Sequence, residues 1–378
     1  MAAQRLIEIH CPADRLAASE AIRRRLAACQ RFEPTDRDPV VFSIALRYLF
    51  DVRSVEVGDY FEDPRTQLEQ QLLNHKWLIE NMVDDRSIDK AQLIVAPDLQ
   101  TVRGGYFDIA VDWFGGTDPV AAPLLHEPED VERLAIPDVR ANLYGRKIAW
   151  FEAMQRMVGE YRVTLNGAPL RIKVSISGAG GPFPDAYALA GQNIFLWVYE
   201  APDVVHSLME KVTTAFINYE RYTRDLTGRP HRHLGLGCDA AEMLSEQMYR
   251  RFVLPYYLRC YETFPGRREL HMCGAIDHLI PLLADEIKIT HLNGFGSVAD
   301  PRLLAKHMGR RVVMSGGLDP VLLLKGPVDA IREQTWHYLG VLATRGGYIL
   351  QDGNNVAPGT PLEHLRAVVE AAEQYAHG

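Results

Sequence analysis

Residues 270–274, LHMCG, combine an imidazole and a thiol at a spacing that can build a metal site. His271 and Cys273 are two residues apart on a predicted strand, so both side chains point to the same face. An imidazole and a thiolate on one face form half of a tetrahedral zinc site, and a catalytic site needs a third protein ligand and an open fourth position. A histidine and a cysteine that only fill the interior are the commoner outcome of so short a pattern.

A third group could come from HLGLGCD, residues 233–239, which reads as another strand end. Strand alternation lets only one of Cys238 and Asp239 face the same side as the first two groups. Asp239 would supply a carboxylate to a metal or a substrate. The alternative is that this carboxylate only stabilises the start of the following helical segment. With His271 and Tyr187, Asp239 also completes a set of groups able to transfer protons.

Two further stretches place polar or flexible residues at strand ends. SISGAGGPFPDAY, residues 175–187, holds Gly180 and Gly181 in a glycine-rich turn before Tyr187, and it matches neither a P-loop nor a dinucleotide fingerprint. Tyr187 is either a phenol donor or an aromatic wall, with simple packing as the alternative. Asn293 occupies a similar place in HLNGFG, residues 291–296, and we expect it to bind substrate together with Gly180 and Gly181.

The segment QDGNN, residues 351–355, lies between a strand-like run and a capping box that begins at Thr360. The free N–H groups and the dipole of the helix that follows favour an anion there. We therefore expect Asp352, Asn354 and Asn355 to contact a substrate.

These candidates require elements that bring their ends together. Short apolar runs alternate with longer amphipathic stretches, which predicts a parallel sheet with helical crossovers. Strand candidates span residues 39–46, 92–98, 107–115, 171–177, 233–239, 268–274, 287–296, 310–319 and 347–353. About eight strand–helix units in this length favour an α/β fold of the (β/α)8 TIM-barrel type, whose active site forms where the strand C-termini converge. Residues 1–35 are predicted to be an N-terminal helical extension, and residues 36–378 a single catalytic barrel domain.

Composition narrows the function. The chain has 378 residues and a formal net charge of −8, which argues against a nucleic-acid or anionic-membrane partner. No apolar stretch is long enough to span a bilayer, and the N-terminus lacks the apolar core of a signal peptide. The five cysteines are scattered, as expected for reduced thiols. These features together predict a cytoplasmic protein with a small-molecule substrate.

Three segments together resemble the uroporphyrinogen decarboxylase superfamily: HMCG (271–274), SGGLDPVLLLKGPVDAIREQ (315–334) and GGYILQDGNNVAPGTPLEHLRAVVEAAEQY (346–375). Within that superfamily they look most like the cobalamin-dependent methyltransferase branch. The resemblance is clearest over residues 230–376, and its most specific feature is the order and spacing of the segments. It implies a (β/α)8 barrel, and either a monomer or a homodimer.

The resemblance implies site residues position by position. In the methyltransferases, His-x-Cys-Gly supplies two zinc ligands, which here would be His271 and Cys273. Their third ligand is a cysteine near the last helix, and the decarboxylases have a histidine at that position, where this chain has Asn354. An amide oxygen is a poor partner for zinc beside a thiolate. Either a carboxylate replaces it, with Asp239 and Asp352 as the candidates, or the metal is absent and Asn354 and Asn355 form hydrogen bonds to a substrate.

Three functions remain open from the sequence. One is a methyltransferase that moves a methyl group between a small methylated substrate and a corrinoid or a thiol. Zinc would be its metal, and its cobalamin would arrive on a separate corrinoid protein because the chain has no Asp-x-His-x-x-Gly motif. The second is a decarboxylase or lyase without metal; Tyr187 would match the decarboxylases' active-site tyrosine, but ALRYLF (45–50), with Arg47, matches their arginine-rich motif poorly. The third is a non-catalytic tetrapyrrole- or corrinoid-binding protein.

Overall fold

The computed structural model describes residues 4–55, 58–100, 102–113, 119–176, 180–343 and 346–377. The strands are β1 (Arg5–Ile9), β2 (Gln92–Val95), β3 (Val111–Asp112), β4 (Val120–Ala121), β5 (Tyr161–Leu165), β6 (Ala168–Val174), β7 (Leu234–Gly237), β8 (Arg268–His271), β9 (His291–Asn293), β10 (Val313–Leu318) and β11 (Tyr348–Asp352). The helices are α1 (Ala13–Gln30), α2 (Leu46–Val52), α3 (Pro64–Asn81), α4 (Pro128–Arg133), α5 (Asn142–Met157), α6 (Pro182–Ala190), α7 (Asn193–Glu200), α8 (Pro202–Thr227), α9 (Glu246–Phe252), α10 (Leu254–Thr263), α11 (Ile280–Leu282), α12 (Pro301–Met308), α13 (Pro320–Lys325), α14 (Val328–Leu342) and α15 (Leu362–His377). Short helical turns occupy η1 (Gly58–Phe61), η2 (Val158–Glu160), η3 (Ala241–Met243) and η4 (Leu283–Ile287).

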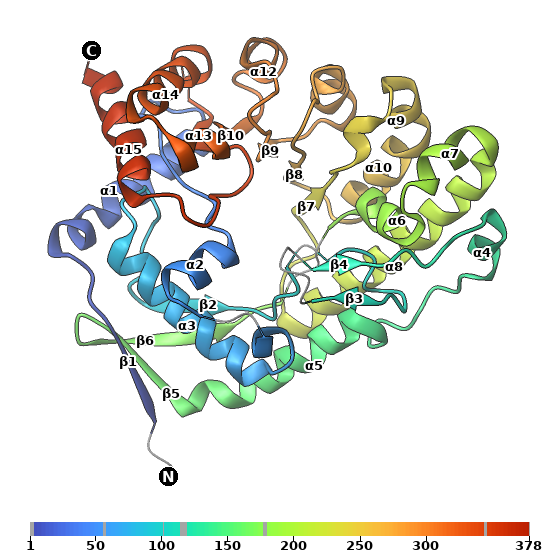
Figure 1. Cartoon of the computed structure of the whole chain (residues 1–378), viewed down its shortest axis with the longest axis horizontal. Coiled ribbons are helices and arrows are strands. Elements are labelled where there is room, and N and C mark those ends of the chain that lie inside the picture. Colours follow the sequence, from blue (N-terminus) through green and yellow to red (C-terminus); the bar gives the residue numbers. More distant parts are fainter. Residues whose placement is uncertain are drawn as a thin grey trace.

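The C-terminal half is built on a parallel five-stranded sheet with the order β11-β10-β9-β8-β7. Figure 1 shows its strands inside an arc of helices that includes α10, α12, α14 and α15. Leu270 and Leu292 have no exposed surface, whereas their neighbours on either side along the chain are only partly buried. Because side chains alternate along a strand, one face of the sheet packs apolar residues and the other presents polar ones.

A second sheet has the order β1-β5-β6-β2, in which β2 and β6 are parallel and β5 and β6 are antiparallel. Residues 39–44 lie beside β11 through two parallel bridges, Val40 with Leu350 and Ile44 with Val356. The N–H of Gly237, in β7, donates to the carbonyl of Gly180 just after β6. The α/β fold is therefore confirmed. A closed barrel is not, because the described strands form separate sheets, and it stays a prediction.

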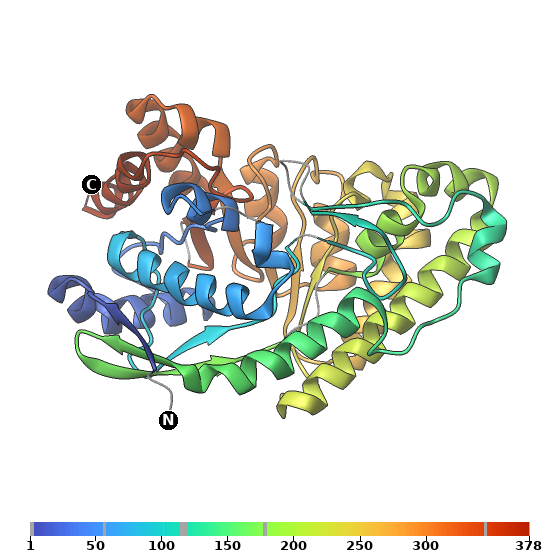
Figure 2. The same cartoon turned by 60° about the horizontal axis from the view of Figure 1, so that its bottom comes forward.

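Two predicted segments differ from the structure. Residues 1–35 are not wholly helical, because β1 pairs in parallel with β5 and buries Ile7 and Ile9. Figures 1 and 2 both show β1 beside the β5–β6 hairpin at the edge of the molecule. Of the predicted strand at 107–115, residues 114 and 115 lie outside the described residues, and within 107–113 the strand is limited to β3, which pairs with the equally short β4. The strand at β1 depends on a pairing partner that is distant in the chain, which local pattern does not specify.

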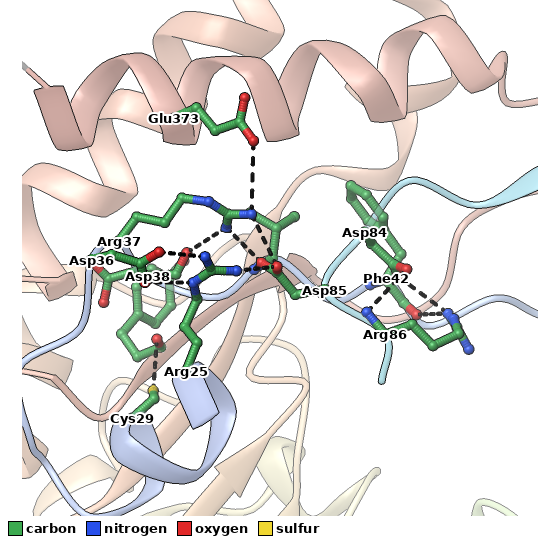
Figure 3. A network of polar contacts seen from close by, with 12 residues as sticks. Arg25, Cys29, Asp36, Arg37, Asp38, Phe42, Asp84, Asp85, Arg86 and Glu373 are labelled. Carbon is green, nitrogen blue, oxygen red and sulfur yellow. Dashed lines mark hydrogen bonds and ion pairs between the residues drawn. The ribbon is translucent and has the colours of Figure 1, made fainter. Parts of the chain in front are cut away.

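A buried ion-pair cluster fastens α1 to the rest of the chain (Figure 3). The Asp85 carboxylate, whose side chain is 2% exposed, accepts hydrogen bonds from the guanidinium groups of Arg25 in α1 and Arg37. It also accepts the backbone N–H of Val40. Arg37 extends towards Glu373 of α15 at 3.9 Å. The Asp85 carboxylate thus links α1 to the segment beside β11, and through Arg37 it is also linked to α15.

Across the ranges that the structure describes, no helix is both long enough and apolar enough to cross a membrane.

Candidate functional site

The end of β8 orients two of the predicted ligands in the same direction. His271 and Cys273 both line one cavity, while Met272 between them has no exposed surface. The His271 side chain is 31% exposed. The alternation expected from the sequence is confirmed, and neither side chain is sealed beneath apolar neighbours.

The end of β7 supplies the third group. Cys238 turns into the core, where its sulfur lies 3.2 Å from the Tyr249 hydroxyl, and this leaves Asp239 to face the cavity. Asp239 Oδ1 lies 3.6 Å from His271 Nε2 and 3.5 Å from Cys273 Sγ. The two strands are neighbours in register, which brings the three groups together although 34 residues separate Asp239 from Cys273.

The separations of Asp239 Oδ1 from the other two donor atoms are those of a tetrahedral zinc site. With ordinary Zn–N, Zn–O and Zn–S bond lengths and tetrahedral angles, the N–O separation would be about 3.4 Å and the S–O separation about 3.6 Å. The separations in the structure are 3.6 and 3.5 Å. All three donor atoms lie within 4.8 Å of one another. The donor set of carboxylate, imidazole and thiol is one that zinc accepts, and it leaves a fourth position free for water or substrate.

The charge around Cys273 is also that of a cation site. Burial raises the pKa of its thiol to about 12, and the nearby Asp239 carboxylate adds to the shift. The thiol therefore keeps its proton, and its S–H donates a hydrogen bond to Asp239 Oδ1. A metal cation between the two groups would reverse this balance, because thiolate and carboxylate are both stabilised by an adjacent positive charge.

A glycine makes room for the imidazole. Gly294 follows β9 with φ +65°, and a Cβ at this position would lie 2.6 Å from His271 Cε1. Beside it, the Asn293 amide donates to Glu269 at 3.2 Å and accepts from the Ser315 hydroxyl at 3.2 Å. These two bonds fix which end of the amide faces each neighbour.

The three donors open into a cavity of about 660 Å³. That volume is in the range of small-molecule sites. Of the residues expected to bind substrate, Tyr187, Asn293, Asn354 and Asn355 line it. The Asn354 side-chain oxygen accepts a hydrogen bond from Asn355, whose own oxygen accepts one from Ser43.

The structure does not bear out the other expected contacts. Asp352 has no exposed surface, and its Oδ1 accepts the Ser43 N–H at 2.7 Å, so it can neither ligate the metal nor touch a substrate in this cavity. Burial raises its pKa to about 7. Gly180 and Gly181 do not line the cavity either. The absence of a side chain at Gly181 instead lets its backbone approach that of Gly237, because a Cβ at position 181 would lie 2.2 Å from the Gly237 carbonyl oxygen.

Sequence reasoning missed Arg103, which also lines the cavity. It lies in VRGGYFD, residues 102–108, shortly after β2. The sequence feature that could have indicated it is an arginine directly before two glycines, close to the end of a predicted strand. In a barrel, that strand end would lie at the same rim as the other site residues.

Comparison with known proteins now decides the family. The family model described as uroporphyrinogen decarboxylase (URO-D) matches residues 21–375. The chain belongs to this family. Its relatives include uroporphyrinogen decarboxylases of Salinibacter ruber, 24% identical over 93% of this chain and 95% of that one, and of Xanthomonas campestris pv. campestris, 26% identical over 92% and 97%.

Among solved structures, a methyltransferase from Methanosarcina mazei superposes with a TM-score of 0.64, at 20% identity, over 94% of this chain and 98% of that one. At this identity the likeness concerns the fold. The URO-D family thus contains this chain, its fold is shared with a methyltransferase, and its sequence relatives bear the name of a decarboxylase.

Proposed function

We propose that this protein is a methyltransferase of the URO-D family that moves a methyl group between a small methylated substrate and a corrinoid or thiol acceptor. The observation that supports this most is the cluster of Asp239, His271 and Cys273, whose donor atoms lie within 4.8 Å of one another. A reaction that uses no metal does not require these three side chains to lie at the distances of metal ligands. The methyltransferase fold match agrees with the proposal.

In this proposal Asp239, His271 and Cys273 hold a zinc ion. When bound, zinc supplies Lewis-acid chemistry, stabilising a thiolate or an anionic leaving atom. When the methyl group is transferred, the donor atom keeps the electron pair of the broken bond, and the acceptor provides the electron pair of the new bond. The donor atom then needs a proton, and the Tyr187 hydroxyl, on the cavity wall, is the group that we assign to supply it.

The remaining wall binds and orients the substrate. Asn293, Asn354 and Asn355 offer amide donors and acceptors to the cavity. A corrinoid acceptor would be presented by a separate protein.

The second candidate is a decarboxylase or lyase that acts on a carboxylated small molecule without metal. The names of the sequence relatives favour it, since they match this chain over more than nine-tenths of its length. In that reaction His271, Asp239 and Tyr187 would exchange protons with the substrate after carbon dioxide leaves.

Metal content and product analysis separate the two. The zinc of purified protein is measured in the wild type, in Cys273→Ala and in Cys11→Ala, which removes a thiol far from the site along the chain. Methyl transfer from methoxylated aromatic compounds to reduced cobalamin is followed alongside release of carbon dioxide. We expect about one zinc per chain in the wild type and in Cys11→Ala, and loss of both zinc and methyl transfer in Cys273→Ala. Full activity in zinc-free wild-type protein would refute the metal-dependent reaction, and carbon dioxide release without methyl transfer would establish the lyase.

A further inference from the structure

Arg103 is the one side chain with a permanent positive charge among the described residues that line the cavity. We propose that its guanidinium binds a carboxylate of the substrate, so that the protein acts on a small carboxylic acid with an apolar body. This substrate class deepens the proposed methyl-transfer function and rests on it, whereas the anion site itself stands on the geometry around Arg103.

Arg103 lies close to the metal-site strands. Its Nη2 atom lies 3.8 Å from the place where a Cβ on Gly237 would be, and Gly237 is the register partner of His271. The guanidinium and the donor cluster of Asp239, His271 and Cys273 line the same cavity. A small molecule held by its carboxylate at Arg103 could therefore reach the donor cluster with another atom.

The glycine-rich turn makes room for this arginine. A Cβ on Gly180 would lie 2.8 Å from Arg103 Cδ and 3.3 Å from its Nε, so any larger residue would displace the side chain. Gly180 also has φ +88°, a conformation that other residues rarely adopt. The turn, which the sequence suggested would contact a ligand directly, thus acts through Arg103.

The charge of Arg103 is left available to a ligand. Within the described ranges, no carboxylate forms an ion pair with it at 4.0 Å or less, and no hydrogen bond from its guanidinium is found. The neighbouring acid, Asp185, has no exposed surface and accepts the Gly104 N–H at 2.7 Å, which holds the loop that presents Arg103. Burial raises the pKa of Asp185 to about 7, so it neutralises the guanidinium only in part.

The guanidinium matches a carboxylate in shape as well as in charge. It is planar, always protonated, and can donate two parallel hydrogen bonds to the two oxygens of one carboxylate. In a cavity only partly open to water, such a pair is stronger than on the surface.

The wall around Arg103 indicates the rest of the ligand. Apolar side chains from the residue before Arg103, from the β4 region and from α6 line the cavity with it: Val102, Pro119, Val120, Ala121, Pro184 and Ala188. Val120 is 59% exposed, which is unusual for so large an apolar side chain. A ligand with an aromatic or aliphatic body would cover this surface while its carboxylate contacts Arg103.

The test compares matched ligands on matched variants. Binding of the three methoxybenzoate isomers and of the corresponding uncharged methoxybenzyl alcohols is measured by calorimetry on zinc-loaded wild type, Arg103→Gln and Arg302→Gln. Arg302 is exposed on α12, and its replacement removes one positive charge outside the cavity. We expect at least one methoxybenzoate to bind the wild type and Arg302→Gln equally, and to bind Arg103→Gln roughly 10- to 100-fold more weakly. Binding of the alcohols and zinc content should not differ among the three proteins.

Each outcome is informative. If no methoxybenzoate binds the wild type more tightly than its alcohol, or if Arg103→Gln binds it as tightly as Arg302→Gln does, the anion site is refuted, whether or not methyl transfer occurs. If the carboxylate preference is lost in Arg103→Gln but no methyl transfer is found, the anion site is supported and the proposed methyl transfer fails. Methyl transfer from the alcohols at wild-type rates in Arg103→Gln, together with slow transfer from the benzoates, would support both.

Discussion

Replacing Gly294 by alanine should weaken zinc binding by at least about 100-fold without unfolding the protein. Gly294 contributes no side chain to the cavity, and it is not a ligand. A Cβ there would lie 2.6 Å from His271 Cε1 and 2.7 Å from Nδ1, well inside ordinary contact. Because the new methyl group is attached to rigid backbone, the imidazole is the part that has to move.

The size of the effect follows from the distances. To restore ordinary contact at 3.4 Å, the Cε1 atom must retreat by about 0.8 Å from its present 2.6 Å. Zinc–nitrogen distances in working sites vary by only about 0.2 Å. The displaced imidazole therefore no longer fits the site defined by Asp239 and Cys273. Since even substitutions behind a ligand lower metal affinity roughly 10- to 100-fold, we expect at least about 100-fold here, or about 2.8 kcal/mol.

Gly228→Ala is the matched control. Gly228 ends α8 with φ +64°, almost the same as the +65° of Gly294, but nothing lies within 4 Å of the point that its Cβ would occupy. Both substitutions should therefore cost about 1–2 kcal/mol in backbone strain. Zinc affinity is measured by competition with a chromophoric chelator, and stability of the metal-free proteins by the urea midpoint.

The two readouts separate the explanations. If the two variants have similar urea midpoints but only Gly294→Ala binds zinc more weakly, the loss of affinity comes from displacement of the imidazole. Equal zinc affinity in the two variants would refute the reasoning, because a ring displaced by most of an ångström cannot remain a ligand with unchanged affinity.

Three further substitutions test the fold around the site. Asp85→Ala should lower the free energy of unfolding by about 3 kcal/mol, since it removes the buried carboxylate shared by Arg25 and Arg37, whose side chains are only 10% and 11% exposed. Asp329→Ala should change it by less than about 0.5 kcal/mol in urea titrations, because the Asp329 side chain is 89% exposed. The raised pKa of Asp352, about 7 when folded, means that its contribution to stability is complete below about pH 4 and is lost as the pH rises through 7; urea midpoints of Asp352→Asn should therefore fall less between pH 5 and 8 than those of the wild type. Gly181→Ala should lower stability by about 3 kcal/mol, because its Cβ would lie 2.2 Å from the Gly237 carbonyl oxygen, and an unchanged thermal midpoint would contradict this.

The sequence predicted those parts of the site that depend on strand alternation. The pairing of His271 with Cys273 on one face needs only a period of two, and the same rule lets only one of Cys238 and Asp239 face that side. The polar residues predicted at the strand ends, Asn293, Asn354 and Asn355, line the same cavity as these groups. The parallel α/β arrangement followed from the alternation of apolar and amphipathic segments.

The remaining features depend on contacts that local pattern does not encode. Asp352 follows the same strand end as Asn354, yet its oxygen accepts the N–H of Ser43, a residue 309 positions away, and this contact buries it. Arg103 reaches the cavity from a segment without regular structure, and only the absence of a side chain at Gly180 permits its path. The pairing of β1 with β5 likewise joins segments more than 150 residues apart.

The departure at Asn354 is best understood as a matter of charge. The resemblance implies that related methyltransferases bind zinc with one imidazole and two thiolates, whose two negative charges balance the ion. An amide at the third position would leave one charge unbalanced in a partly buried site, which is costly. Asp239 Oδ1 lies 3.5 Å from Cys273 Sγ and 3.6 Å from His271 Nε2, so in the proposed zinc site its carboxylate would supply the missing charge from β7 instead of from the loop after β11. The same sum of ligand charges would then come from a different strand, and Asn354, which lines the cavity, would act as a hydrogen-bonding group instead of a ligand.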